Sequence, residues 1–206
     1  MSELGLFPLG IVLLPTERVP LHIFEPRYKE LIGECLDSQG EFGLVLADDE
    51  GLRAVGTRAA VTDVLHRFPD GRLQIVVEGG ERFRLVRMTS GRSFQTAEVE
   101  PLEDEDADAA DDERERALEL YGRLTAAAGS EPDELDADSS SLSFEIAARI
   151  DFGAELKQRL LETRSEPERL ETLAGLLEQA EQAVAAERER AEHASTNGKV
   201  SPLYER

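Results

Sequence analysis

Cysteine and histidine are scarce in this chain of 206 residues, which contains one Cys and three His. One cysteine excludes a framework of internal disulfides, and the scattered histidines do not give the ligand spacing of a zinc site. The acidic run from Glu103 to Asp112 could collect cations, but it lacks the central glycine of a calcium-binding loop. The sequence therefore predicts no bound metal and no cofactor.

Positive charge is also in short supply, because 23 Lys and Arg residues stand against 44 Asp and Glu residues, a net charge of −21. Binding to phosphate groups needs clustered basic residues, so nucleic acids and anionic membrane surfaces are not expected as partners. No stretch approaches the ~20 apolar residues of a membrane span. The N-terminal segment has no basic leader, and prolines interrupt its apolar run, which is unlike a signal peptide. We expect a cytoplasmic protein.

Sequence motifs of catalysis are missing as well. The phosphate-binding pattern GxxxxGK[ST] does not occur, since Gly198-Lys199 is followed by Val200 and lacks the upstream glycine. His22 and Cys35 could be imagined as a base and a nucleophile, but nothing indicates a third group to orient them. Cys35 lies on an apolar helical face, where an inert buried thiol is typical. We predict no catalytic residue.

The residues that are present begin with two proline-framed apolar runs, within the segment FPLGIVLLPTERVPLHIFEPRY at positions 7–28. Phe7–Leu14 and Val19–Phe24 are rich in β-forming residues. The prolines that bound them are Pro8, Pro15 and Pro20. Because proline cannot donate a hydrogen bond to a sheet, both runs are predicted to be strands at a sheet edge or barrel rim.

A helix is predicted directly after these strands, over Pro26–Ser38. Pro26 suits the first helical position, and Glu25 is placed to cap the helix. Apolar side chains then recur at the spacing of one helical face, namely Tyr28, Leu31, Ile32, Cys35 and Leu36.

Short strands fill the rest of the first hundred residues. They are predicted at Phe42–Ala47, Val55–Phe68 and Leu73–Val77, at a further strand that begins near Phe83, and at Phe94–Val99. Pro69-Asp70-Gly71 has the chemistry of a turn, and Gly79-Gly80 is expected to break a strand. Arg82 and Arg84 alternate along a strand and are expected to face water. This pattern predicts a small, partly open barrel or two packed sheets.

Helices are predicted after Pro101. The first covers Asp111–Ala128 and ends at Gly129, and a polar loop follows at 130–141. Leu142, Ile146 and Ile150 indicate a second helix that stops by Gly153, and Leu156, Leu160 and Leu161 indicate a third. The last helix begins at Ser165, which can form a capping box with Glu168, and runs to Ala194. Its apolar seam is expected to pack on neighbouring helices and consists of Leu170, Leu173, Leu177, Ala180 and Val184.

Charge divides the chain further, because residues 103–138 hold 15 acidic residues against 3 Arg, a net charge of −12. We therefore expect a β-rich pseudo-barrel at 1–102 and an acidic connector with one helix at 103–141. A helical lobe follows at 142–194, and a frayed tail at 195–206.

The order of several short motifs carries a family resemblance. The motifs are Val12-Leu13-Leu14-Pro15, PLHIFEPRY, Phe42–Leu46, Val55-Gly56-Thr57, Asp70-Gly71, Gly80–Arg84, Ala97-Glu98-Val99, Ile146-Ala147, Lys157-Gln158, Leu160–Glu162 and Glu168–Glu171. Together they resemble the N-terminal, substrate-binding domain of the Lon ATP-dependent proteases, in its stand-alone form without ATPase or peptidase domains. The resemblance implies an α+β fold, in which a PUA-like pseudo-barrel of short strands with one helix precedes a C-terminal helical bundle ending in a long helix.

The resemblance and the residues together favour a non-catalytic module that captures extended, apolar polypeptide segments. Strand edges would supply hydrogen bonds, and apolar pockets between barrel and helical lobe would hold side chains. The candidate binding residues are Leu13, Leu14, Val19, Phe24 and Tyr28. We expect Leu14 and Phe24 to lie beside an apolar groove; the alternative is that such residues fill the barrel core.

Two other functions stay open at this point. The chain could be a structural or regulatory adaptor that docks one protease or chaperone partner through its acidic connector and long helix. It could also be a small hydrolase. A client-binding module suppresses aggregation of several unrelated denatured proteins, whereas an adaptor enriches one partner in a pull-down. The sequence leaves the oligomeric state undetermined.

Overall fold

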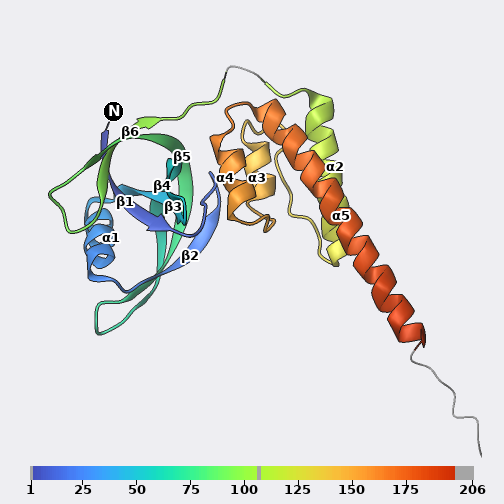
Figure 1. Cartoon of the computed structure of the whole chain (residues 1–206), viewed down its shortest axis with the longest axis horizontal. Coiled ribbons are helices and arrows are strands. Elements are labelled where there is room, and N and C mark those ends of the chain that lie inside the picture. The colour runs from blue at the N-terminus through green and yellow to red at the C-terminus, as the bar shows by residue number, and fades with distance from the viewer. Residues whose placement is uncertain (1, 106–107, 198–206) are drawn as a thin grey trace, which may run out of the picture.

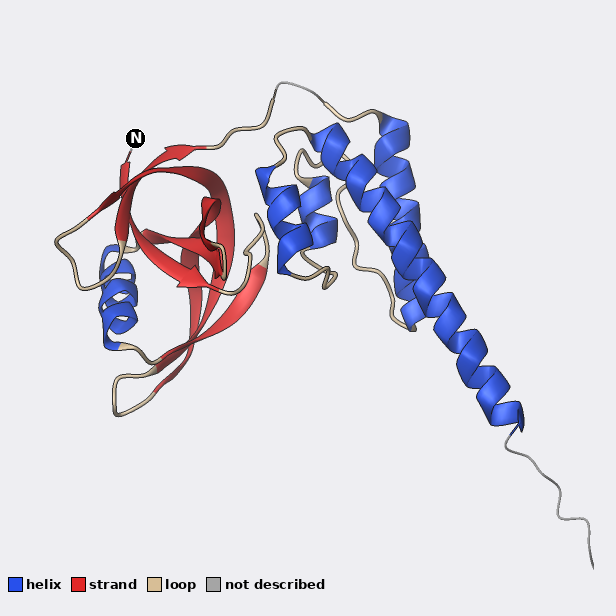
Figure 2. Ribbon diagram, viewed as in Figure 1, coloured by secondary structure: helices blue, strands red, loops and turns tan. Residues whose placement is uncertain are grey.

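The computed structural model describes residues 2–105 and 108–197, in which a β-rich lobe precedes a helical lobe (Figures 1 and 2). The elements of the β-lobe are β1 (Ser2–Leu9), β2 (Arg18–Ile23), α1 (Pro26–Ser38), β3 (Glu41–Asp48), β4 (Gly51–Arg67), β5 (Leu73–Thr89) and β6 (Thr96–Pro101). Those of the helical lobe are α2 (Asp111–Ala128), α3 (Leu142–Ala147), α4 (Ala154–Glu162) and α5 (Glu166–Asn197). The expected α+β architecture is confirmed.

The sheet closes on itself through β5. Its strand order is β2-β5-β4-β3-β1-β6, and β6 pairs back onto β5. The first part of β5, Leu73–Glu78, pairs with β2, and the later part, Phe83–Thr89, pairs with β6. Because one long strand serves two partners in succession, the sheet forms a barrel with β2 added at one end of β5 (Figure 2).

Proline positions match the free edges of this barrel, as predicted. Pro20 lies in β2, which ends the strand order and pairs with β5 alone among the described strands. Pro8 lies in the half of β1 that pairs with β3, whereas β6 pairs with the other half, Ser2–Gly5. A residue without an N–H donor is tolerated at such positions because no neighbouring strand requires its hydrogen bond.

The first strand ends earlier than predicted. β1 stops at Leu9, and the residues after it form a loop rather than a strand up to Leu14. Thr16 has a left-handed backbone with φ of +66°, and its N–H donates to the carbonyl of Gly79 at 2.8 Å. The Gly79 N–H donates in return to the Glu17 carbonyl at 2.9 Å. Pro15 thus begins a turn that docks the loop on β5.

Gly79-Gly80 does not break a strand, because β5 runs through both residues. The structural reason for Gly79 is the close approach of the loop. A Cβ atom built on Gly79 would lie 2.1 Å from the Leu14 carbonyl oxygen, whereas one on Gly80 would meet its nearest neighbours at 3.6 Å. Glycine therefore serves here as room for a second backbone rather than as a terminator.

Helix α1 has the predicted bounds, and its apolar face covers the barrel. Tyr28, Leu31, Ile32 and Cys35 are buried, and the Tyr28 ring meets that of Phe7 edge-on at 4.1 Å. Glu25 precedes the helix but makes no side-chain cap. Its carboxylate instead pairs with Arg27, so this detail of the prediction is wrong.

The helical lobe follows the predicted periodicity with shifted ends. α2 ends at Gly129, whose φ of +82° needs glycine, as predicted. α3 stops at Ala147, so Ile150 lies outside the helix but still packs against the core. α5 begins after Ser165, whose Oγ accepts the Glu168 N–H at 3.4 Å. α5 continues through Asn197, beyond the predicted end at Ala194. Residues 198–206 of the expected frayed tail lie outside the described residues.

One hydrophobic cluster joins the two lobes. It combines Val12, Leu14, Leu46, Val55 and Leu102 of the β-lobe and its end with Leu142, Phe144, Ile146, Leu160, Leu161, Leu170, Leu173 and Leu177 of the helices. α2 packs along α5, where Arg116 and Glu178 form an ion pair at 2.8 Å. The helix expected in the connector is thus part of the helical packing. Separate folding of the ranges 1–102 and 142–194 stays a prediction.

The contrast between adjacent glycines gives the first testable prediction. Gly79→Ala pushes Cβ against the Leu14 carbonyl, and because two backbones must move apart, we expect the free energy of unfolding to fall by about 3 kcal/mol. Gly80→Ala is the matched control, with an expected change within about 1 kcal/mol. Urea unfolding followed by circular dichroism measures both. Equal effects of the two substitutions would contradict the docked loop.

Candidate binding site between the lobes

A cleft of about 590 Å³ lies between the barrel and the helical lobe. We call it the interlobe cleft, and it is lined by Pro15, Thr16, Gly79, Gly80, Glu81, Arg82, Pro101, Leu102, Glu103, Asp104, Ser141 and Phe144. The loop before β2, the middle of β5 and the end of β6 form one wall. α3 forms the other, and Figure 1 shows α3 and α4 between the barrel and the α2–α5 pair.

Arg82 of β5 reaches from the barrel to the helical lobe. Its side chain is 5% exposed, and Nη1 donates to the carbonyl oxygens of Leu161 at 2.8 Å and Thr163 at 2.7 Å. These carbonyls lie at the C-terminal end of α4, where helical carbonyls lack intrahelical partners and carry partial negative charge. Nη2 pairs with Asp104. Arg82 therefore caps a helix of the other lobe.

Arg169 of α5 meets the same carboxylate from the opposite lobe. It is fully buried and binds both oxygens of Asp104, at 2.7 and 2.6 Å. It also pairs with Glu166 at 2.6 Å, and Glu166 accepts the backbone N–H of Ser143 at 2.8 Å. The guanidinium carbon lies 4.3 Å from the centre of the Phe144 ring. We call the linked side chains of Arg82, Asp104 and Arg169 the interlobe ion network. The two arginines of this network contact the Phe144 ring, which forms an apolar wall of the cleft.

The electrostatics of the interlobe ion network favour an ionised Asp104. Burial alone would raise the pKa of this carboxyl, but hydrogen bonds and charge from Arg169 and then Arg82 outweigh burial and hold the pKa below its usual range. Burial lowers the pKa of Arg82, against the attraction of Asp104. Both arginines nevertheless stay protonated at neutral pH, because the guanidinium group is the most basic side chain in proteins. The network therefore carries two cations and one anion at neutral pH, before Glu166 is counted.

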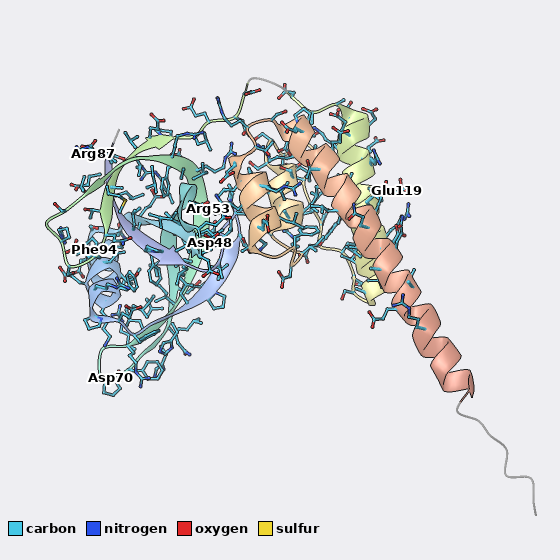
Figure 3. All side chains as sticks on the ribbon, in the orientation of Figure 1. Asp48, Arg53, Asp70, Arg87, Phe94 and Glu119 are labelled. Carbon is cyan, nitrogen blue, oxygen red and sulfur yellow. The ribbon has the colours of Figure 1, made fainter. Side chains whose placement is uncertain are left out.

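A second ion pair fixes the opposite side of the lobe contact. Lys157 of α4 and Glu17 of the loop before β2 meet at 2.6 Å, and both side chains are nearly buried. Glu17 also accepts the Leu14 N–H at 2.9 Å. On the side of the barrel that faces α4, Asp48 and Arg53 form a further pair at 2.7 Å (Figure 3). The Lys157–Glu17 pair is thus a second polar contact between the lobes, beside the interlobe ion network, whereas the Asp48–Arg53 pair lies within the barrel.

The predicted binding residues do not gather in the interlobe cleft. Leu13 and Leu14 are almost completely buried, and Tyr28 lies in the barrel core against Phe7. The expectation that Leu14 lies beside a groove is therefore wrong. The Leu14 side chain instead lies in the cluster shared by both lobes, where burying an apolar residue is favourable.

Val19 and Phe24 lie nearer the surface. Val19 is partly buried and borders a smaller cleft of about 230 Å³ with Ile11 and Lys157. Phe24 is 58% exposed, and its ring lies 5.9 Å from that of His22. A role for these two residues in binding stays a prediction.

Sequence reasoning missed the main polar residue of the cleft. Arg82 was expected to face water and is buried instead, whereas Arg84 is exposed as expected. The reason is that α4 covers the outer face of β5 at this point and offers free carbonyls. Strand alternation shows which face a side chain is on, but not whether a distant helix covers that face.

The residues considered for catalysis or metal binding lie apart from the cleft. His22 is exposed on β2, whereas Cys35 is buried on α1, and no described hydrogen bond joins them. Among the described residues no group of three or more His, Cys, Asp or Glu side chains could hold a metal ion. No described helix has the length and apolar character needed to cross a membrane.

The acid dependence of stability tests the ion network. Asp104→Asn leaves two buried arginines without their shared carboxylate, and because a third of the Asp104 side chain is exposed, we expect a loss of about 2 kcal/mol at pH 7. The folded pKa is depressed, so this contribution is complete above the unfolded value of 3.8 and is lost as the pH falls through the folded value. Urea unfolding from pH 7 to pH 2 measures the difference between parent and variant.

Glu105→Gln is the control for this prediction, since its side chain is exposed one residue further along the same segment. It removes the same charge and should leave stability within about 0.5 kcal/mol of the parent. If the Asp104 variant matches this control at neutral pH, the network does not stabilise the lobe contact.

The thiol of Cys35 gives an independent check on the barrel core. Burial, with smaller contributions from Glu34 and Glu41, raises its pKa to about 11. At pH 8 roughly one thiol in a thousand is ionised, so a disulfide reagent should label the native protein at least ~100-fold more slowly than the urea-unfolded protein. Absorbance of the released thiolate follows the reaction. Fast labelling without denaturant would contradict the burial of this face of α1.

Comparison with known sequences gives one family. The chain matches the family described as the ATP-dependent protease La (LON) substrate-binding domain over residues 3–179. It is 32% identical over 176 residues to the Lon protease of Paraburkholderia phytofirmans, which covers 78% of this chain and 22% of that protein. It is 26% identical over 184 residues to Lon protease 1 of Hydrogenovibrio crunogenus, covering 82% of this chain and 22% of that protein. The chain spans about a fifth of the length of these curated relatives.

Solved structures agree with this family. The Lon N-terminal domain protein from Xanthomonas campestris superposes with a TM-score of 0.68 at 27% identity, over 85% of this chain and 98% of that one. The N-terminal domain of the Mycobacterium avium complex Lon protease gives a TM-score of 0.65 over 86% and 98% of the two chains. At 19% identity, the second likeness shows the fold alone.

Proposed function

We propose that this chain, which belongs to the LON substrate-binding domain family, binds extended, apolar segments of other polypeptides in its interlobe cleft. Family membership supports a substrate-binding module. The observation that carries the finer proposal is the cleft itself, which lies between the lobes and combines apolar side chains with a strand edge. Its volume of about 590 Å³ is within the usual range of ligand pockets.

A strand edge in the cleft supports an extended ligand. Along one side of β5, pairing with β2 ends at Glu78 and pairing with β6 begins at Phe83. Between them the loop before β2 bonds to Gly79, and Leu102 donates to the Arg82 carbonyl. The backbone at Gly80 and Glu81 thus lies beside the cleft without a strand partner on that side. An extended peptide can add hydrogen bonds at such a gap.

Apolar surface supplies the second element of recognition. Phe144 and Leu102 lie at the inner part of the cleft, and Pro15 and Pro101 lie nearer solvent. Prolines and an aromatic ring offer rigid surface, so binding costs little side-chain entropy in the protein. Side chains of an extended ligand that point into the cleft would contact these residues, which favours apolar clients.

The proposed role is non-catalytic. The sequence lacks the phosphate-binding pattern, and the two least exposed charged groups of the cleft, Arg82 and Asp104, are paired with each other. A cytoplasmic location is part of the same proposal. The adaptor function stays an alternative, because α5 extends well beyond the end of α2 (Figure 1), and a long helix can dock one partner.

Filling the cleft tests the proposal. Ser141 lines the cleft, and its backbone conformation, with φ of −121°, accepts any residue. Ser141→Trp should weaken binding about tenfold or more, because the indole occupies the space of the ligand. The probe is a fluorescein-labelled synthetic peptide with an alternating Leu–Val centre, and fluorescence anisotropy measures its Kd.

Ser140→Trp provides the matched control, since Ser140 is exposed and does not line the cleft. It should bind the peptide like the parent, and thermal unfolding should show that both variants are folded. Equal binding by the two Trp variants would place the site outside the interlobe cleft. If the parent binds no peptide at all, the proposed function fails, and a single partner enriched by pull-down would favour the adaptor.

A further inference from the structure

Two carboxylates of the interlobe cleft have no cationic partner among the described residues. Glu81 and Glu103 both line the cleft and are exposed, and neither side chain makes an ion pair or hydrogen bond with another described side chain. We call them the rim carboxylates. They differ from Asp104, whose charge is taken up by Arg82 and Arg169.

The strand register places the rim carboxylates on neighbouring backbone segments. Phe83 faces Pro101 across the β5–β6 pair, and the Leu102 N–H donates to the Arg82 carbonyl at 3.0 Å. Glu81 and Glu103 come next on these two neighbouring segments, where β5 and the chain leaving β6 enter the cleft. Like charges on adjacent segments repel each other, and a cation between them relieves the repulsion.

The cation that lines the cleft is engaged elsewhere, and Arg164, which does not line it, donates through Nε to the Glu103 backbone carbonyl at 2.9 Å. Arg82 is the one basic side chain among the described residues that line the interlobe cleft. Its Nη1 donates to the carbonyl oxygens of Leu161 and Thr163, and its Nη2 donates to the carboxylate of Asp104. The Arg82 guanidinium is therefore fully engaged in the contact between the lobes. The unpaired charge that the cleft offers to a ligand is the negative charge of Glu81 and Glu103.

We propose that the interlobe cleft selects polypeptide segments in which Lys or Arg residues flank the apolar residues. This inference rests on the proposed function and assigns the ligand its charge. The apolar side chains lie against Phe144 and Leu102, while an ammonium or guanidinium group lies between the rim carboxylates. The net charge of −21 attracts cationic segments over longer range and repels acidic segments.

The experiment compares three labelled peptides with the same Leu–Val centre and with Lys, Ser or Glu flanks. For the parent we expect the Lys-flanked peptide to bind about tenfold more tightly than the Ser-flanked one, and the Glu-flanked one to bind weakest. The double variant Glu81→Gln/Glu103→Gln should reduce the preference for Lys over Ser to about twofold. Its affinity for the Ser-flanked peptide should stay near that of the parent. Anisotropy titrations at low and physiological salt give the Kd values, and salt should weaken the preference.

The matched control is Asp37→Asn/Glu115→Gln, which changes the net charge equally. Asp37 in α1 and Glu115 in α2 are exposed and do not line the cleft. This control should retain most of the preference for Lys flanks. Thermal unfolding verifies that every variant is folded, since substitutions at exposed sites should shift stability little.

The outcomes separate this inference from the function on which it rests. If the parent binds Lys- and Ser-flanked peptides equally, the charge selection is wrong while peptide binding stands. If the rim variant and the control lose the preference equally, the overall charge selects the ligand and the rim carboxylates do not. If no peptide binds the parent, the proposed function itself fails, and this inference fails with it.

Discussion

The carboxylate of Asp104 lies between two guanidinium groups that come from different parts of the fold. Arg82 belongs to the barrel and Arg169 to the helical lobe, while Asp104 lies on the segment that links them. Taking such ions out of water costs several kcal/mol each unless every donor finds an acceptor. Here the end of α4 supplies the remaining acceptors through Leu161 and Thr163. The barrel, the link and two helices must therefore adopt one mutual arrangement.

This arrangement also determines the surface that the cleft offers. Phe144 lies beside both guanidinium groups, at 5.2 Å from Arg82 and 4.3 Å from Arg169, so its ring is held in place as an apolar wall. Because both cations point inward, unpaired charge at the cleft comes from Glu81 and Glu103 alone among its described lining residues. The same two arginines thus join the lobes and, because their charge is paired there, leave only negative charge unpaired among the described lining residues.

Local patterns in the sequence predicted the structure correctly where the structure depends on residues close together in the chain. α1 follows from Pro26 and one apolar face, and the end of α2 follows from Gly129, whose positive φ favours glycine. The prolines correctly indicated free strand edges, because a missing N–H has the same consequence in any fold. The order of short motifs then indicated the family and, through it, the barrel followed by helices. These features involve contacts within a few residues or properties of a single residue.

The cleft could not be predicted in this way, since its residues are defined by contacts between distant segments. Gly79 in a strand is compatible with a break or with close approach of another backbone, and the deciding contact is the Leu14 carbonyl. The same contact turns Leu14 inward, so a residue chosen for surface binding became part of the shared core. Arg82 has the alternation of a solvent-facing residue, and α4 covers it. A sequence shows which residues can pair or pack, but the partner that completes each pair here comes from the other lobe, and the cleft exists only once those pairs have formed.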